Sequence, residues 1–233
     1  MDSGIISKER VKQFGEVFTP DSIVCDMIDL VEKQWGDISD EEYISKTYLE
    51  PACGDGQFLI RLLERKLKRV KNLPEEQREF ALIKAVASIY GVDIQSDNIG
   101  DIETRGKKRS EQSSRGRMLK IIEGKEVRTF DLDGKDRIIK VDLGIELKDK
   151  VKKAIKSILN ANIVVGNTLD KTNRVKMFEY KFNDEGTVQV NEFELGVENG
   201  SEQWSKEVAY TELRSLLSKN EDTTDDSNDS WDF

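Results

Sequence analysis

The stretch YLEPACGDGQFLIRLLERKL, residues 48–67, decides the fold because it predicts a strand, a glycine turn and a helix in immediate succession. The residues TYLEPA are typical of a short strand that enters a turn. Between strand and helix, Gly54 and Gly56 flank Asp55, and glycine permits positive φ and the close approach of a ligand. The helix that follows has its apolar side chains three and four residues apart on one face, namely Phe58, Leu59, Leu62, Leu63 and Leu67.

Two further strands follow along the chain. SIYGVDI predicts a strand over 89–94 that ends in an acid, and ANIVVGN predicts a third strand before Asn167. Helical patterns separate these strands, including ELKDKVKKAIKSILN, which is rich in good helix formers. Strands that alternate with helices favour a doubly wound, Rossmann-like α/β sheet, in which a ligand lies beyond the carboxyl ends of the strands.

The polar residues at those strand ends indicate a ligand with several chemical groups. The first amides of the helix after the glycine turn favour a carboxylate or phosphate, whereas Asp55 favours an ammonium group. Asp93, at the end of the second strand, is placed to accept both hydroxyls of a ribose. S-adenosylmethionine combines these groups and is the cofactor that the pattern predicts. The alternative is a plain β-turn-α unit whose glycines serve packing only.

Composition excludes several other kinds of protein. The 233 residues contain no histidine, which rules out histidine acid–base and triad chemistry, and two cysteines predict neither a disulfide framework nor a metal site. No apolar run has the length of a bilayer crossing and no signal peptide is evident, so we expect a cytoplasmic protein. The formal net charge of −9 disfavours broad nucleic-acid binding but leaves room for a local basic face.

The chain resembles the cofactor-binding half of S-adenosylmethionine-dependent N6-adenine DNA methyltransferases of the restriction-modification type. The resemblance comes in ordered pieces, GEVFTPDSIVCDMIDLV, EPACGDGQFL, IYGVDIQSDNI and NIVVGNTLD, and covers roughly residues 14–100 and 160–170. It implies a methyltransferase fold with a Thr-Pro turn over the methionine end of the cofactor. The residues that it implies as cofactor contacts are Phe18, Thr19, Pro20, Glu50, Ala52, Gly54, Asp55, Gly56, Phe58, Asp93, Ile94, Asn167 and Leu169.

One part of the family pattern is missing. These enzymes hold the target base with an Asn/Asp/Ser-Pro-Pro-aromatic loop, but the prolines here are Pro20, Pro51 and Pro74. Asn167 in VGNTLD is either part of the third cofactor motif or a degenerate catalytic residue. Two hypotheses therefore stand: a phage or restriction-type DNA adenine methyltransferase, alone or completed by a partner subunit, or a catalytically inactive methyltransferase-fold protein that binds DNA or a protein.

A basic, glycine-broken segment interrupts the predicted domain at about residues 101–140, and KIIEGKEVRTFDLDGKDRIIKVDL within it predicts a small hairpin. The segment is either a phosphate-contacting loop beside the cofactor or a solvated insertion. The residues predicted to contact nucleic acid are Arg105, Lys107, Lys108, Arg109, Arg115 and Arg117.

The last third of the chain predicts a hairpin, a helix and a tail. RVKMFEYKFNDEGTVQVNEFEL alternates around NDEG as a β-hairpin does, and its aromatic residues either stack on bases or face the core. A short helix is expected over 207–218, which closes a domain of about residues 10–218. Residues 219–233 predict a disordered acidic tail, which serves either solubility or the docking of Trp231 and Phe233 in a protein partner. The aromatic residues of the hairpin are Phe178, Tyr180, Phe182 and Phe193.

Overall fold

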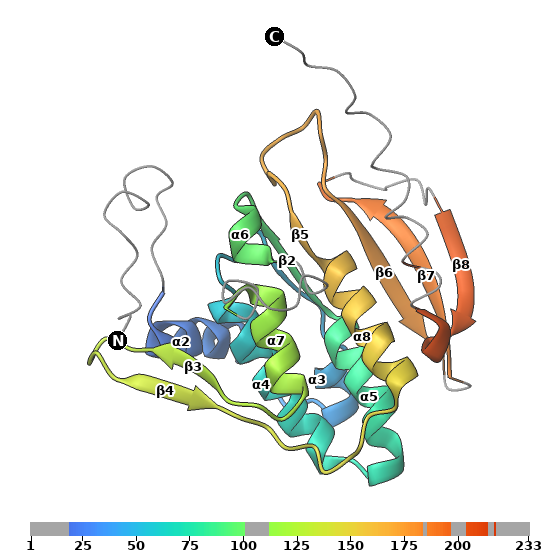
Figure 1. Cartoon of the computed structure of the whole chain (residues 1–233), viewed down its shortest axis with the longest axis horizontal. Coiled ribbons are helices and arrows are strands. Elements are labelled where there is room, and N and C mark those ends of the chain that lie inside the picture. Colours follow the sequence, from blue (N-terminus) through green and yellow to red (C-terminus); the bar gives the residue numbers. More distant parts are fainter. Residues whose placement is uncertain (1–18, 101–111, 184–185, 197–203, 214–216, 218–233) are drawn as a thin grey trace.

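The computed structural model of the chain describes residues 19–100, 112–183, 186–196, 204–213 and 217. Helices and strands alternate in its first two thirds, and strands dominate the last third (Figure 1). The fold is therefore of the mixed α/β kind, as predicted. None of the helices within the described ranges has the length and the apolar composition that a bilayer crossing requires.

A parallel sheet forms the centre of the domain, with the strand order β1-β2-β5. All three strands were predicted, although each ends within one or two residues of the expected position. Leu49 pairs with Tyr90, and Val92 pairs with Val164, so the three strands are in continuous register. Their bounds are Tyr48–Glu50 for β1, Ile89–Asp93 for β2 and Ile163–Val165 for β5.

Helices connect these strands and pack against the sheet and one another (Figure 1). The glycine turn leads directly into the longest of them, α4, as the periodicity of its sequence predicts. The helices are α2 (Asp21–Glu32), α3 (Asp40–Ser45), α4 (Gln57–Asn72), α5 (Glu75–Ala87), α6 (Ser96–Ile99), α7 (Ser114–Ile122), α8 (Asp149–Asn162) and the 3-10 helix η1 (Tyr210–Glu212).

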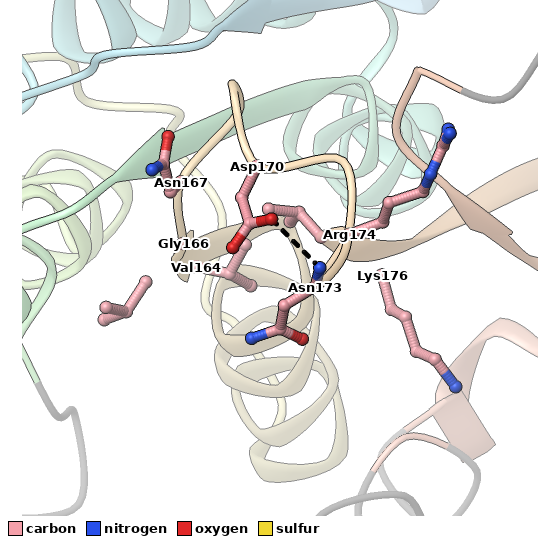
Figure 2. Close-up of a pocket in the computed structure, with 9 residues that line it drawn as sticks. Val164, Gly166, Asn167, Asp170, Asn173, Arg174 and Lys176 are labelled. Carbon is pink, nitrogen blue, oxygen red and sulfur yellow. Dashed lines mark hydrogen bonds between the residues drawn. The ribbon is translucent and has the colours of Figure 1, made fainter.

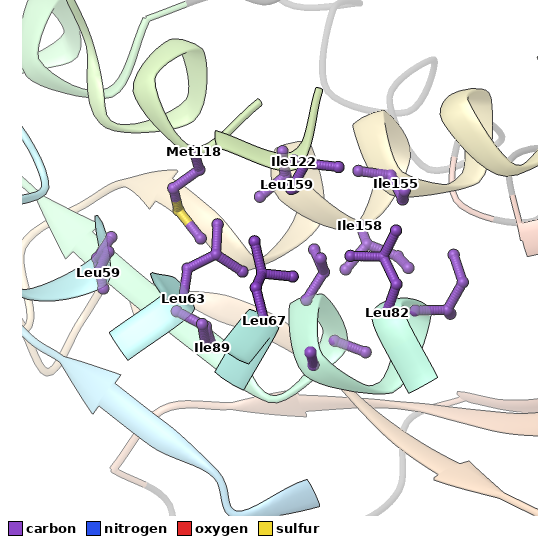
Figure 3. Close-up of a cluster of buried hydrophobic side chains, with 14 of the residues drawn as sticks. Leu59, Leu63, Leu67, Leu82, Ile89, Met118, Ile122, Ile155, Ile158 and Leu159 are labelled. Carbon is purple, nitrogen blue, oxygen red and sulfur yellow. The ribbon is translucent and has the colours of Figure 1, made fainter. Parts of the chain in front are cut away.

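The two faces of the parallel sheet bury different partners. Ile89 and Ile163 belong to a large apolar cluster with side chains of α4, α5, α7 and α8, part of which Figure 3 shows. Tyr90 and Val92 alternate with Ile89 along β2 and pack on the opposite face, against Met177 and its neighbours. An antiparallel sheet thus covers the face that helices would cover in a doubly wound fold.

That antiparallel sheet has the order β6-β7-β8, with β6 at Lys176–Phe182, β7 at Thr187–Glu194 and β8 at Trp204–Ala209. The β6–β7 hairpin confirms the prediction made from its alternating pattern. Phe178 is 8% exposed, and the Tyr180 hydroxyl donates to Asn162 Oδ1 at 3.0 Å. These aromatic side chains therefore serve the core, and the alternative of base stacking does not apply to them.

The central sheet winds in one direction only. Each crossover moves from β1 to β2 to β5, and within the described residues no strand pairs with the outer edge of β1. A doubly wound sheet would continue past that edge, where its strand order reverses. The described chain therefore forms a parallel α/β sheet of the singly wound kind, and a second winding is not part of it.

Two local predictions differ from the structure. Residues 207–209 end β8 and 210–212 form η1, so the helix predicted over 207–218 does not occupy the first half of that range, whereas the later described residues 213 and 217 are helical. At the start of α2 the N-cap residue is Pro20, no side chain caps the helix, and the Asp21 carboxylate binds Arg61.

The described part of the predicted insertion, 112–140, is also built into the domain rather than added to its surface. Met118 and Ile121 of α7 are fully buried in the main apolar cluster. The predicted hairpin is present as β3 (Val127–Phe130) and β4 (Asp136–Ile139). The glycine-broken, basic composition of this segment concealed a helix whose apolar residues are confined to its second half.

Lys66 is a buried cation in the middle of α4. Its side chain is 0% exposed, and its ammonium donates to the carbonyls of Tyr43, Ile44 and Lys46 and to Ser88 Oγ at 2.6 to 3.2 Å. It thereby caps the last turn of α3, where carbonyls run out of helical amide partners, although the Tyr43 carbonyl also accepts from Lys46 N at 3.2 Å. Burial lowers the pKa of Lys66 to about 7, and the charge of Glu32 offsets part of that shift.

This shift predicts a pH dependence of stability. Between about pH 7 and the ordinary lysine value of 10.5, the unfolded chain binds more protons at Lys66 than the folded chain, so stability rises with pH. We expect the free energy of unfolding of wild type, relative to Lys66→Met, to rise by about 2 kcal/mol from pH 7 to pH 9. Urea unfolding across this range measures it. The control is Lys68→Met, at a lysine whose side chain is 62% exposed on the same helix. Because this variant keeps Lys66, the stability of wild type relative to it should stay constant with pH, and an equal rise would contradict the assignment.

Candidate functional site at the carboxyl edge of the parallel sheet

The glycine turn has the backbone geometry that its sequence predicts. Gly54 has a φ of +53° and Gly56 a φ of +88°, and Gly56 is the N-cap residue of α4. A Cβ added at Gly56 would lie 2.8 Å from Ser114 Cβ, whereas one added at Gly54 would meet nothing within 4 Å. Both glycines adopt the positive φ for which the sequence called. Gly56 is also needed for packing, as the alternative of a plain β-turn-α unit supposed, because α7 leaves no room for a side chain there.

The amides of the turn that precede α4 are bound by the protein itself. Ala52 N donates to Glu50 Oε1 at 3.2 Å, Cys53 N to the carbonyl of Val92 at 2.8 Å, and Gly54 N to Asp93 Oδ2 at 2.8 Å. The reason is that the turn folds back onto the end of β2. The first turn of α4 is different, because no side chain caps it.

Asp93 lies where the sequence placed it, at the end of β2, and is 9% exposed. Its Oδ1 accepts from Gln95 N at 2.8 Å and from Asn98 Nδ2 at 3.2 Å, and its Oδ2 accepts from Gly54 N. An ionised carboxylate offers about four acceptor positions. Within the described structure three are used, so Asp93 has room for one further donor rather than for both hydroxyls of a ribose.

Asp55 is paired with a cation of the protein. Arg117 Nη1 contacts Asp55 Oδ2 at 2.7 Å and the Asp55 carbonyl at 3.0 Å, and Arg117 Nη2 donates to the carbonyl of Arg128 at 3.0 Å. Arg117 is only 6% exposed. Burial lowers the pKa of Arg117 and the charge of Asp55 opposes that change. A ligand ammonium at Asp55 would have to compete with this guanidinium.

The second described residue of the predicted nucleic-acid cluster is also turned inward. Arg115 donates to the carbonyls of Ile163, Gly100 and Asn160 at 2.7 to 3.2 Å, and so ties α7 to β5 and to the end of α8. Arg115 and Arg117 are therefore engaged by oxygens of the fold. The other members, Arg105, Lys107, Lys108 and Arg109, lie outside the described residues.

The remaining predicted cofactor residues fall into three groups. Glu50 is half-buried, and burial raises the pKa of its carboxyl group. Ile94 and Leu169 are apolar yet 64% and 87% exposed, beside the ends of β2 and β5. Phe58 packs against the main cluster, Ala52 is exposed, Thr19 and Pro20 lie at the start of α2, and Phe18 lies outside the described residues.

Asn167 follows β5 and lines a shallow pocket of about 200 Å³. Asp170, Asn173 and Arg174 line it from the loop that follows, and in Figure 2 the Asn167 amide points away from them. Asp170 accepts from the backbone of Asn173 at 3.2 Å, and Asn167 accepts from Leu169 N at 3.0 Å. The strand order is β1-β2-β5, so β5 lies beside β2 and not beside β1. Asn167 therefore lies at the end of the third strand, on the far side of β2 from β1.

Sequence reasoning missed two residues with structural roles, Ser114 at this edge and Lys66 at the amino ends of β1 and β2. Ser114 Oγ donates to the carbonyls of Gly54 and Asn98, and no local pattern marks that contact. Lys66, by contrast, had a visible signal. It lies on the apolar face of α4, three residues after Leu63 and one before Leu67. A lysine at such a position of a helix faces the core together with its apolar neighbours.

Comparison of the chain with family models, curated proteins and solved structures found no match. Among the described residues, no group of three histidine, cysteine, aspartate or glutamate side chains is arranged to hold a metal ion.

Proposed function

We propose that the chain binds S-adenosylmethionine and is similar in function to DNA adenine methyltransferases of the phage or restriction-modification type. One observation carries the proposal. Glu50, Asp93 and Asn167 end or follow three adjacent parallel strands, in the order β1, β2, β5, at the same edge of the sheet. That edge is where parallel α/β sheets bind nucleotides.

The chemistry along this edge suits the parts of the cofactor in sequence. The uncapped first turn of α4 favours the methionine carboxylate. Glu50 is the acid for the ammonium group, since Asp55 already pairs with Arg117. Asp93 accepts one ribose hydroxyl at its remaining position, and the exposed side chains of Ile94 and Leu169 cover the adenine ring.

Isothermal titration of S-adenosylmethionine tests this assignment. We expect binding to wild type and a loss of about 10- to 100-fold in affinity for Asp93→Asn, because a charge-assisted hydrogen bond contributes about 1.5–3 kcal/mol. Asp142→Asn is the matched control, since Asp142 also accepts a backbone amide, that of Gly144 at 2.9 Å, but lies in a different loop. Wild type that shows no heat of binding, or variants that bind equally, would overturn the proposal.

A second candidate is a binding or regulatory protein that keeps the cofactor but transfers no methyl group. It is favoured by the absence of any proline after Pro74, because the catalytic loop of the family needs a Pro-Pro pair. In a doubly wound sheet that loop would follow a strand beyond β1, and no described strand lies there. Methyl transfer by this chain therefore requires an unusual loop or a strand from a partner subunit.

A tritiated-methyl assay on mixed duplex DNA separates the two candidates. Label in DNA identifies a methyltransferase, and cofactor binding without label identifies the second kind of protein. If label appears only after another subunit is added, we expect that subunit to contact this chain at the outer edge of β1. DNA remains the proposed nucleic-acid partner in each case, and its binding is measured separately from methyl transfer.

A further inference from the structure

Helix α8 presents a strip of lysines to solvent in a chain whose net charge is −9. Its buried side chains, among them Val151, Ile155 and Ile158, face the core, while the opposite side carries cations. Asp149 is the sole acid between positions 148 and 156. We call this strip the lysine face; it consists of Lys148, Lys150, Lys152, Lys153 and Lys156.

The lysine face is unfavourable for the helix itself. Lysines in the first turns of a helix oppose its dipole, and the pairs Lys148–Lys152 and Lys152–Lys156 place like charges four residues apart. Lys148 has a distant partner, Glu79, at 3.9 Å. The other four lysines form no ion pair with the described residues. Helix stability therefore does not explain the pattern, whereas the positive charge is complementary to an anionic ligand.

The chain contains a segment of the opposite charge. Residues 221–233, EDTTDDSNDSWDF, hold six acidic residues and no basic one. The described part of the chain ends beside α8, since η1 packs against this helix and Leu217 is buried in the main cluster with the apolar side chains of α8. The Tyr210 hydroxyl donates to Glu79 Oε1 at 3.1 Å, and the same carboxylate faces Lys148.

The lengths are compatible with contact between the two. The 14 residues of α8 span about 21 Å, and residues 218–233 could extend over about 50 Å. A segment tethered this closely has an effective concentration of the order of millimolar at the face, so that weak charge–charge contacts suffice. The charge of residues 221–233, their length and the place where the described chain ends are all compatible with binding of this segment to the lysine face.

We propose that the acidic segment 221–233 docks on the lysine face of α8 within the same chain. It neutralises the strip and excludes other polyanions, including nucleic acid, from this side of the domain. The contact is electrostatic, because the described face offers cations rather than an apolar groove. This inference does not depend on cofactor binding.

Zero-length carbodiimide cross-linking of the full chain tests the proposal, because it joins only carboxylates and amines in direct contact. We expect peptides from 221–233 to be joined to Lys152, Lys153 and Lys156 in the monomer band, as mapped by mass spectrometry. The yield should fall at least about fivefold in 1 M salt, where the screening length is about 3 Å. The triple variant Lys152→Gln, Lys153→Gln, Lys156→Gln should lose the products.

The matched control is Lys125→Gln, Lys135→Gln, Lys140→Gln, which removes three exposed lysines from another part of the surface and should keep the products. Cross-links spread evenly over exposed lysines would overturn the proposal, as would products confined to a dimer band. Heparin retention gives an independent reading. Deletion of 221–233 should strengthen retention of wild type but not of the α8 triple variant, and unchanged retention would contradict masking.

Discussion

Arg61→Met is expected to destabilise the fold by about 3–5 kcal/mol, the cost typical of removing one partner from a buried ion pair. Arg61 Nε donates to Asp21 Oδ1 at 2.5 Å, Nη2 pairs with the other oxygen of that carboxylate, and Nη1 contacts Glu64 Oε2 at 2.5 Å. The side chains of Arg61, Asp21 and Glu64 are only 12%, 8% and 11% exposed. Without the guanidinium, Asp21 keeps the Thr129 hydroxyl, at 3.1 Å, as its side-chain donor.

Arg69→Met supplies the comparison for urea unfolding. Arg69 lies on the same helix and pairs with Asp40 at 2.7 Å, but its side chain is 45% exposed, so we expect a loss of at most about 1 kcal/mol. Adding Asp21→Asn to Arg61→Met should recover part of the lost stability, because no unpaired charge remains. Equal losses at Arg61 and Arg69 would show that the α2–α4 ion pair does not anchor the start of α2.

Gly56→Ala is expected to cost about 3 kcal/mol, the sum of left-handed strain and overpacking. Its φ is +88°, and the new Cβ would approach Ser114 Cβ to 2.8 Å and Ser114 Cα to 3.0 Å. Ser114 begins α7, and its hydroxyl is fixed by the carbonyls of Gly54 and Asn98, so it cannot move without breaking those bonds. Thermal and urea unfolding measure the loss.

Gly54→Ala separates strain from packing in the same turn. Gly54 also has positive φ, at +53°, but its added Cβ would meet nothing within 4 Å, so we expect a cost of about 1 kcal/mol from strain alone. Equal effects at the two glycines would mean that α7 does not press on the turn. The contact matters for the proposed function because it places α7 against the edge where the cofactor is expected.

The strand-turn-helix unit and the element types of the central domain could be predicted because their signals are local. Positive φ at Gly54 and Gly56 and the acid at the end of β2 follow from neighbouring residues alone. The hydrogen-bond partners of those groups do not follow from neighbouring residues. The bonds from Gly54 N to Asp93 and from Arg117 to Asp55 join residues 39 and 62 positions apart, and no periodicity encodes them.

The aromatic hairpin and the basic segment show the same division. Alternation predicted the hairpin, but it left open which face is buried, and the packing of Phe182 on Phe80 of α5 decided it. Positive charge between 101 and 117 suggested a phosphate surface, yet Arg115 and Arg117 point into the fold. Arginine satisfies several buried carbonyls at once, so composition alone does not separate a structural arginine from a ligand-binding one.

The sequence by itself determined the glycine turn, the three parallel strands, the amphipathic helices and the opposed charges of α8 and residues 221–233, because each depends on spacing or composition within a short window. Only the tertiary structure decided the order β1-β2-β5, the inward course of Arg115 and Arg117 and the side of the domain where the lysines remain exposed. The physical reason is that burial and hydrogen-bond partners are properties of contacts between distant segments, and these form only when the chain packs.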